Sequence, residues 1–131
     1  MVTFALDSNT VSYALREEGA VASRLRAIGP RQIVLPSLVV FEVKFGLIRV
    51  GRHRLIDAFA RMVQTLPVID FDLEAAEHAA TIRAHLDPRG TPIGLADLLI
   101  AATARRHGCT LVTHNTREFA RVPDLRIEDW Y

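Results

Sequence analysis

The chain contains very little cysteine and no long hydrophobic segment. Cys109 is the only cysteine among the 131 residues, so no disulfide can form within the chain, and we expect a reducing, cytoplasmic compartment. The first apolar stretch, residues 2–6, ends at Asp7 and is too short for the core of a signal peptide. No apolar run approaches the roughly 18 residues of a membrane span. These absences predict a soluble protein that is neither disulfide-stapled nor membrane-embedded.

A strong excess of charge is also absent, since the formal net charge is +1. Basic residues are nevertheless concentrated in residues 19–69, which hold eight arginines or lysines against two acids, Glu42 and Asp57. Such a stretch can bind an anionic partner such as RNA, because it neutralises phosphates. It can equally form the solvated faces of ordinary helices, and the sequence leaves both interpretations open.

Short apolar runs alternate with segments of helical periodicity along the chain. Strands are predicted at residues 2–6, 32–35, 68–69, 110–113 and 126–127. Helices are predicted at residues 9–15, 20–28, 38–50, 54–64, 73–86, 95–106 and 115–119, with Ser37 and Asp72 as N-caps. This alternation predicts an α/β fold with a central, mainly parallel sheet and helices on both faces, built as one domain of residues 1–131. In such sheets the functional site lies at the carboxyl ends of the strands.

Three acids stand in apolar surroundings. Asp7 follows the first strand directly, and Glu42 and Asp97 lie within apolar helical segments. Burying an ionised carboxylate costs several kcal/mol unless a partner compensates its charge. The sequence offers few cations for this purpose, whereas Mg²⁺ prefers oxygen ligands and is often held by one or two carboxylates. The three acids therefore predict a metal site.

Each acid also has an ordinary structural explanation. Asp7 can cap the following helix, and Asp97 can be a first-turn acid favoured by the helix dipole. Glu42 can pair with Arg49 or Arg83. The metal site is unnecessary only if all three explanations are correct at once. That combination is less probable than any one of them alone.

The segment after the last buried strand carries further polar side chains to the same edge of the sheet. Thr113, Asn115 and Glu118 lie there within the stretch THNTREF. Asn115 can cap a short helix instead, and Glu118 can be a surface acid.

Four sequence motifs, in order, resemble those of the PIN-domain family. Residues 6–10 (LDSNT) resemble its LDTN opening, and residues 37–46 resemble its S-x-x-x-x-E-x-x-x-G motif around Glu42. Residues 93–101 resemble the third motif, around Asp97, and residues 113–119 resemble T-x-N-x-x-[DE]-F. The ending EDW, with the other motifs, resembles the VapC toxins of that family.

The resemblance implies a three-layer α/β/α PIN fold and a Mg²⁺-dependent endoribonuclease toxin of a VapBC toxin–antitoxin pair, with Mn²⁺ as a substitute metal. It implies a VapB-type antitoxin as partner, a homodimer, and an RNA substrate. The fullest match is with enzymes that cleave initiator tRNA in the anticodon stem-loop. Carried over by position, the catalytic residues are Asp7, Glu42, Asp97 and Glu118, the metal ligands are Asp7 and Asp97, and the supporting residues are Asn9, Thr113 and Asn115.

Two other functions compete with this one. A HAD-type phosphatase needs a second aspartate two residues after the first, and Asn9 stands at that position. A catalytically inactive PIN-like RNA-binding module remains the alternative, although Asp7, Glu42 and Asp97 are all present.

Overall fold

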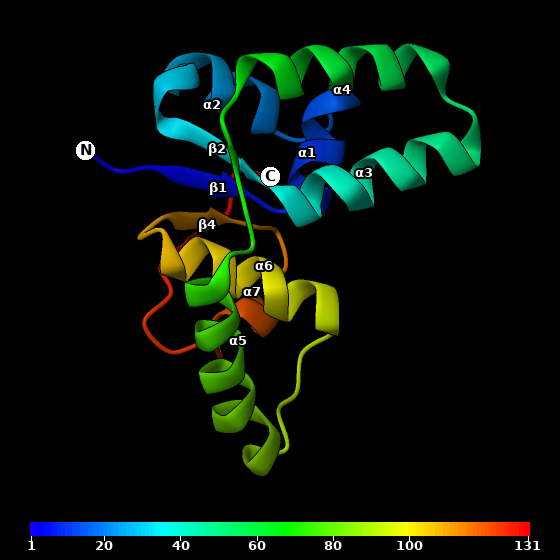
Figure 1. The fold of residues 1–131 in the computed structure, drawn as a ribbon. Helices are drawn as coiled ribbons and strands as arrows, with labels where there is room; N and C mark the ends of the chain where they lie inside the picture. The colour runs from blue at the N-terminus through cyan, green and yellow to red at the C-terminus, as the bar shows by residue number, and fades with distance from the viewer.

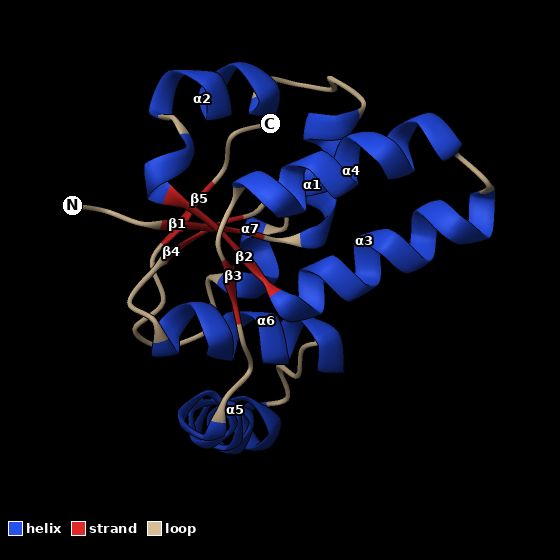
Figure 2. Ribbon diagram, turned by 45° about the horizontal axis from the view of Figure 1, so that its top comes forward, coloured by secondary structure: helices blue, strands red, loops and turns tan.

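The computed structural model describes residues 1–131 and is built around one sheet of five parallel strands. The strands lie in the order β3-β2-β1-β4-β5, with β1 in the centre (Figure 2). The predicted parallel α/β class is therefore confirmed. The strands are β1 (Phe4–Leu6), β2 (Ile33–Pro36), β3 (Val68–Ile69), β4 (Thr110–Val112) and β5 (Ile127–Glu128).

Seven helices cover the two faces of the sheet, which gives three layers (Figure 1). Helices α1 to α4 lie on one face, and α5 to α7 lie on the other. They are α1 (Ser8–Leu15), α2 (Val21–Ile28), α3 (Ser37–Val50), α4 (His53–Thr65), α5 (Leu73–Leu86), α6 (Leu95–Arg106) and α7 (Thr116–Phe119). None of these helices combines the length and the hydropathy that crossing a membrane requires.

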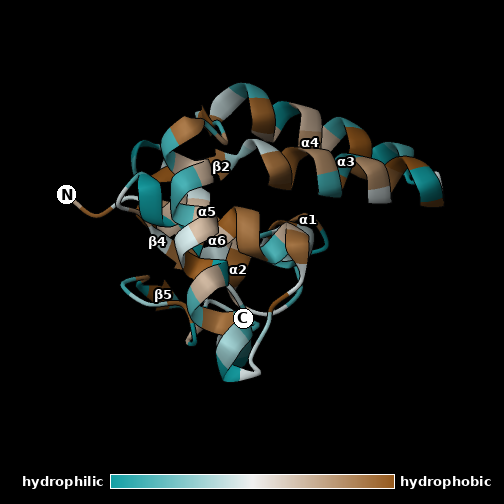
Figure 3. Ribbon diagram, turned by 60° about the horizontal axis from the view of Figure 1, so that its bottom comes forward, coloured by the Kyte–Doolittle hydropathy of each residue, from teal (hydrophilic) through white to brown (hydrophobic).

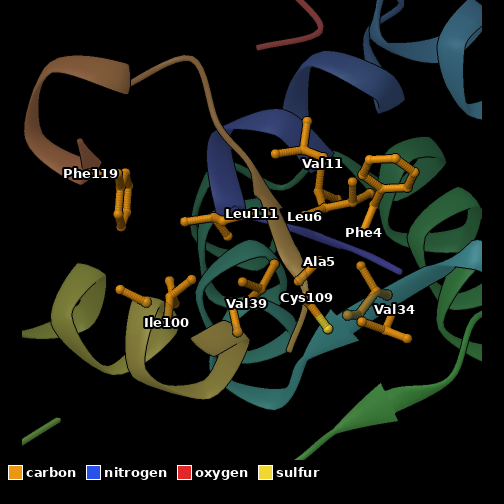
Figure 4. Close-up of a cluster of buried hydrophobic side chains, with 14 of the residues drawn as sticks. Phe4, Ala5, Leu6, Val11, Val34, Val39, Ile100, Cys109, Leu111 and Phe119 are labelled. Carbon is orange, nitrogen blue, oxygen red and sulfur yellow. The ribbon is translucent and has the colours of Figure 1, made fainter. Parts of the chain in front are cut away.

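The core consists of apolar side chains from the central strands and from helices on both faces (Figure 4). Leu6 and Leu111 of the sheet are fully buried, as are Val11 of α1 and Ile100 of α6. The central strands β1 and β4 are short and buried along their whole length because both of their faces are covered. Burial of this kind stabilises the fold by roughly 1.5–3 kcal/mol for each large side chain, and it fixes the sheet that positions the site.

The central strand is the point at which the sheet topology switches direction. Phe4 of β1 pairs with Ile33 of β2 on one side and with Thr110 of β4 on the other. The chain leaves β1 toward β2 and later returns to the opposite side as β4. In open α/β sheets a crevice forms at the carboxyl end of strands at such a point. Asp7 follows β1 there.

The structure confirms one of the two helix N-caps predicted from the sequence. Asp72 caps α5 as predicted, because its Oδ1 accepts a hydrogen bond from the Ala75 amide at 2.8 Å. The prediction that Ser37 caps α3 is wrong. Pro36 still pairs with Ile69 in the sheet, and its φ of −61° leads the chain directly into the helix, so Ser37 is already the first helical residue.

Candidate active site

Asp7 is held at the carboxyl end of β1 by both its backbone and its side chain. Its amide donates to the Val112 carbonyl at 3.1 Å, which extends the pairing of β1 with β4. Its Oδ1 accepts from the Thr10 amide at 2.9 Å, so Asp7 is the N-cap of α1. The capping explanation of this residue is therefore correct, although it accounts for only part of the environment of the carboxylate.

The Asp7 carboxyl group is only 5% exposed, and no cation pairs with it. Burial raises its pKa above the ordinary value of 3.8, even though hydrogen bonds from Thr10 and Thr113 oppose that shift. The neighbouring Glu42 carboxylate raises the pKa further. Cap hydrogen bonds thus leave the negative charge of Asp7 uncompensated.

Glu42 comes to the same place from α3. Its Oε1 accepts a hydrogen bond from the Ser8 hydroxyl, which joins the first turn of α1 to the middle of α3. The proposed pairing with Arg49 or Arg83 does not occur, because Arg83 binds Asp87 at 3.2 Å and Glu42 belongs to no ion pair. Ser8 is therefore a site residue whose role the sequence did not reveal, since its partner is 34 positions away.

Asp97 enters from the opposite layer, in the first turn of α6. Burial raises its pKa from 3.8 to about 6, and the carboxylates of Asp7, Glu42 and Glu118 each raise it as well. Three acids from three separate segments thus influence the Asp97 carboxyl group. No arginine, lysine or histidine forms an ion pair with any of them. The structure therefore brings the sequence-predicted acids together as an uncompensated cluster.

The segment between β4 and α7 supplies the remaining polar groups. The Thr113 hydroxyl accepts from the Asn115 amide at 3.0 Å and also contacts Asp7. Asn115 occupies the N-cap position of α7, but its side chain does not cap; its Nδ2 donates to Glu118 Oε2 at 3.1 Å. The alternative of Asn115 as a capping side chain is therefore wrong, and the amide orients Glu118 instead.

A hollow of about 390 Å³ opens beside the cluster, between α1, α3 and α4. Ser8, Asn9 and Glu42 line the end near the acids, whereas Arg16 and Arg52 line it further away. The basic residues of the stretch 19–69 are all exposed and belong to the α2–α4 layer or the segments beside it; they are Arg24, Arg26, Arg31, Lys44, Arg49, Arg52, Arg54 and Arg61. Asp7 is thus buried and the other three acids are partly buried, whereas the cations are exposed, and Arg52 is the one of this stretch that lines the same hollow as Glu42.

The carboxylate oxygens of this site suit a hard divalent cation that keeps part of its water shell. No three histidine, cysteine or acidic side chains converge into a preformed metal cage. Mg²⁺ does not need one, because it keeps several waters and binds through one or two carboxylates. The carboxyl groups of Asp7 and Asp97, whose raised pKa values report unbalanced negative charge, are oxygen donors of that kind. The residues therefore fit such an ion.

A parallel α/β fold with uncompensated acids at its switch point defines a class of candidate phosphodiester hydrolases. The model of the PIN domain matches residues 4–125. The chain is 33% identical to the tRNA(fMet)-specific endonuclease VapC of Salmonella typhimurium and 34% identical to the protein of that name from Shigella flexneri, over 99% of each chain. Its fold matches that of the DNA-bound VapBC structure from Salmonella typhimurium with a TM-score of 0.91, 33% identity and full coverage of both chains. The chain belongs to the PIN-domain family, within its VapC group of ribonucleases.

Proposed function

We propose that the chain is a Mg²⁺-dependent endoribonuclease toxin that is neutralised by a VapB-type antitoxin. The observation that carries this proposal is the Asp97 carboxyl group, whose pKa is raised to about 6 by burial and by three other acids. Neighbouring acids disfavour the ionised form of one another. Such a cluster is expected where a bound cation compensates the negative charge or where the acids take part in a reaction.

In this proposal Asp7 and Asp97 hold the metal ion, and Glu42 and Glu118 complete the acidic site. When bound, Mg²⁺ would lower the pKa of an attacking water and offset the charge of the scissile phosphate. Mn²⁺ would substitute for it. Two hydroxyl groups position the acids. The Ser8 hydroxyl donates a hydrogen bond to Glu42, and the Thr113 hydroxyl contacts Asp7.

Asn115 and Asn9 support the site in different ways. Asn115 holds Glu118 through its amide, so that this carboxylate faces the other acids rather than solvent alone. Asn9 is exposed beside Glu42 at the end of the hollow, where its side chain can contact the sugar or phosphate of RNA.

The substrate we propose is initiator tRNA, cut in the anticodon stem-loop. The names of the Salmonella typhimurium and Shigella flexneri relatives support this choice. The exposed cations of the α2–α4 layer support an RNA partner in general, because cations neutralise phosphates, and one of them, Arg52, lines the hollow that also contains Glu42.

A protein partner has a suitable surface on α3. Hydrophobic residues recur along the ribbon of α3 (Figure 3). Phe41, Phe45, Ile48 and Val50 are each more than half exposed, and the rings of Phe41 and Phe45 stack with their centres 6.4 Å apart. Exposed apolar clusters of this kind mark protein–protein contacts. We propose a homodimer that also binds a VapB-type antitoxin. The matched structure is of a VapBC complex, which supports the antitoxin as a partner. The mass of the co-expressed complex, measured by light scattering, tests this assembly.

The function is tested by incubating a total small-RNA pool with the antitoxin-free protein, in Mg²⁺ and in chelator, beside the Asp97→Asn variant. Discrete cuts that require both the metal and Asp97 are expected, and sequencing of the new ends identifies the RNA. A folded protein that binds RNA but cuts nothing in Mg²⁺ or Mn²⁺ would overturn the proposal and favour the inactive RNA-binding module.

A further inference from the structure

Three aromatic rings form an exposed group that the proposed chemistry does not use. Tyr131 and His114 stack with their ring centres 4.4 Å apart, and Tyr13 meets the edge of Tyr131 at 4.8 Å. Tyr13 also meets His114 at 5.9 Å. We call these residues the aromatic cluster. Tyr131 is 50% exposed, so its ring is accessible from solvent.

Hydrogen bonds and close packing fix the rings of the aromatic cluster in place. The Asp129 carboxylate binds His114 Nδ1 through one oxygen at 2.9 Å and the Tyr131 amide through the other at 3.0 Å. Gly19 provides the space behind Tyr131, because a Cβ at Gly19 would lie 3.0 Å from the Tyr131 ring. Rings held in this way lose little conformational freedom when a planar ligand stacks on them.

The aromatic cluster is joined to the acidic site by short stretches of the chain. His114 is the residue between Thr113, which contacts Asp7, and Asn115, which holds Glu118. Tyr13 lies on the same helix as Asn9, one turn further along. The guanidinium of Arg16 lies 5.8 Å from the Tyr13 ring centre and also lines the hollow that leads to Glu42.

We propose that the aromatic cluster is a nucleotide subsite that stacks one unpaired base of the RNA next to the bond that is cut. Single-stranded RNA is recognised chiefly by stacking of splayed bases on aromatic rings, together with contacts to phosphate. Arg16 is the cation for the adjacent phosphate. The inference rests on the proposed function. RNA is favoured over an antitoxin segment because Arg16 lies over the Tyr13 ring and lines the hollow that leads to Glu42, whereas the exposed apolar residues suited to a protein partner lie on α3.

The test uses an RNA hairpin that carries a single 2-aminopurine in its loop, because stacking quenches the fluorescence of that base. Binding is measured in the Asp97→Asn background with Mg²⁺, so that the RNA is not cut. Tyr131→Leu is expected to weaken binding about 5- to 20-fold and to abolish the quench, whereas Tyr131→Phe retains a ring and restores the quench. In the cleavage-competent protein, Tyr131→Leu is expected to raise KM more than it lowers kcat.

Three results would overturn the subsite. Equal quench and affinity in the Leu and Phe variants, while the wild-type protein still cuts RNA, would overturn it and leave the proposed function intact. Weaker binding of the antitoxin alone would reassign the rings to that partner. Failure of the wild-type protein to bind or cut RNA would overturn the subsite and the proposed function together, and the wild-type cleavage assay distinguishes this case from the first.

Discussion

Two aspartates of this chain are both helix N-caps, but the charged groups around them differ. Asp7 caps α1 and Asp72 caps α5, each by accepting a hydrogen bond from the amide three residues later, at 2.9 and 2.8 Å. Arg106 lies 3.3 Å from Asp72, and the pKa of Asp72 is lowered, chiefly by the Ala75 amide. Asp7 has no cation, and burial raises its pKa.

The difference separates a structural acid from a candidate catalytic one. The second acid near Asp72 is Glu74, which also lies within 3.2 Å of Arg106. The acids near Asp7 are instead Glu42 and Asp97, and Glu118 lies near Asp97, so each added carboxylate increases the excess of negative charge. A fold has no structural need for such an arrangement, because a cap alone requires one acid. Uncompensated negative charge around an N-cap is therefore better evidence for a bound ligand than the presence of an aspartate at the N-cap.

The largest expected effect follows from changing the two caps in the same way. Asparagine preserves capping, so neither Asp7→Asn nor Asp72→Asn should unfold the protein. Asp7→Asn is expected to lower the rate of RNA cleavage at least about 100-fold, because it removes a proposed metal ligand. Asp72→Asn should leave the rate unchanged. Single-turnover cleavage with circular dichroism as the folding control checks both, and equal rates in the two variants would contradict the distinction drawn between the caps.

Metal binding should distinguish the two acidic groups without any RNA present. An ion at ten times its Kd stabilises the folded state by about 1.4 kcal/mol, so Mg²⁺ should raise the melting temperature of the wild-type protein by about 3–6 °C. Asp97→Asn should lose most of this increase, and Glu74→Gln should retain it. Differential scanning fluorimetry gives the comparison. An undiminished increase in Asp97→Asn would place the ion elsewhere.

The pH dependence of stability should have opposite signs for the two groups. The folded pKa of Asp97, about 6, exceeds its ordinary value of 3.8, so the folded chain binds more protons between these values. Its contribution to the free energy of unfolding therefore falls as pH rises from about 4 to about 6, and it is constant above that range. The lowered pKa of Asp72 acts the other way, and its contribution is lost as pH falls below 3.8.

This prediction is measured as the difference between wild-type protein and Asp97→Asn in urea unfolding with chelator. Asp97 is only partly buried, so solvent screening reduces the expected change to on the order of 1 kcal/mol. Asp97→Asn should gain stability relative to the wild-type protein as pH rises from about 4 to about 6. A difference that is independent of pH would mean that Asp97 titrates normally.

The sequence was sufficient for most of the fold because its apolar runs and caps are local signals. Residues 73–86 and 95–106 were predicted as helices and form α5 and α6 with those bounds. The strand predicted at 126–127 lies at Ile127–Glu128 instead, because its position depends on pairing with β4 rather than on its own composition. Ser37 was wrongly predicted as an N-cap because the capping preference of serine is a local property. It carries no information on the pairing of Pro36 with Ile69 in the sheet.

The candidate site could be predicted residue by residue but not as a network. Asp7, Glu42 and Asp97 stood out because acids are uncommon in apolar segments. Their mutual influence could not be predicted, since it depends on how α3 and α6 meet the end of β1. The bond from Ser8 to Glu42 and that from His114 to Asp129 were missed for the same reason, because each joins segments distant in sequence.

The smallest expected effect comes from removing the cation that distinguishes the two caps. Arg106→Gln leaves Asp72 and Glu74 without their partner, but the buried Arg106 Nε already lacks a hydrogen bond of good geometry. The loss should therefore be modest, a fall in melting temperature of about 2–4 °C. Cleavage should be unchanged, because Arg106 contacts none of the four acids of the candidate site. A cleavage rate that fell with the melting temperature would show that the α5–α6 pair positions Asp97, and the ion pair would then belong to the site rather than to the scaffold.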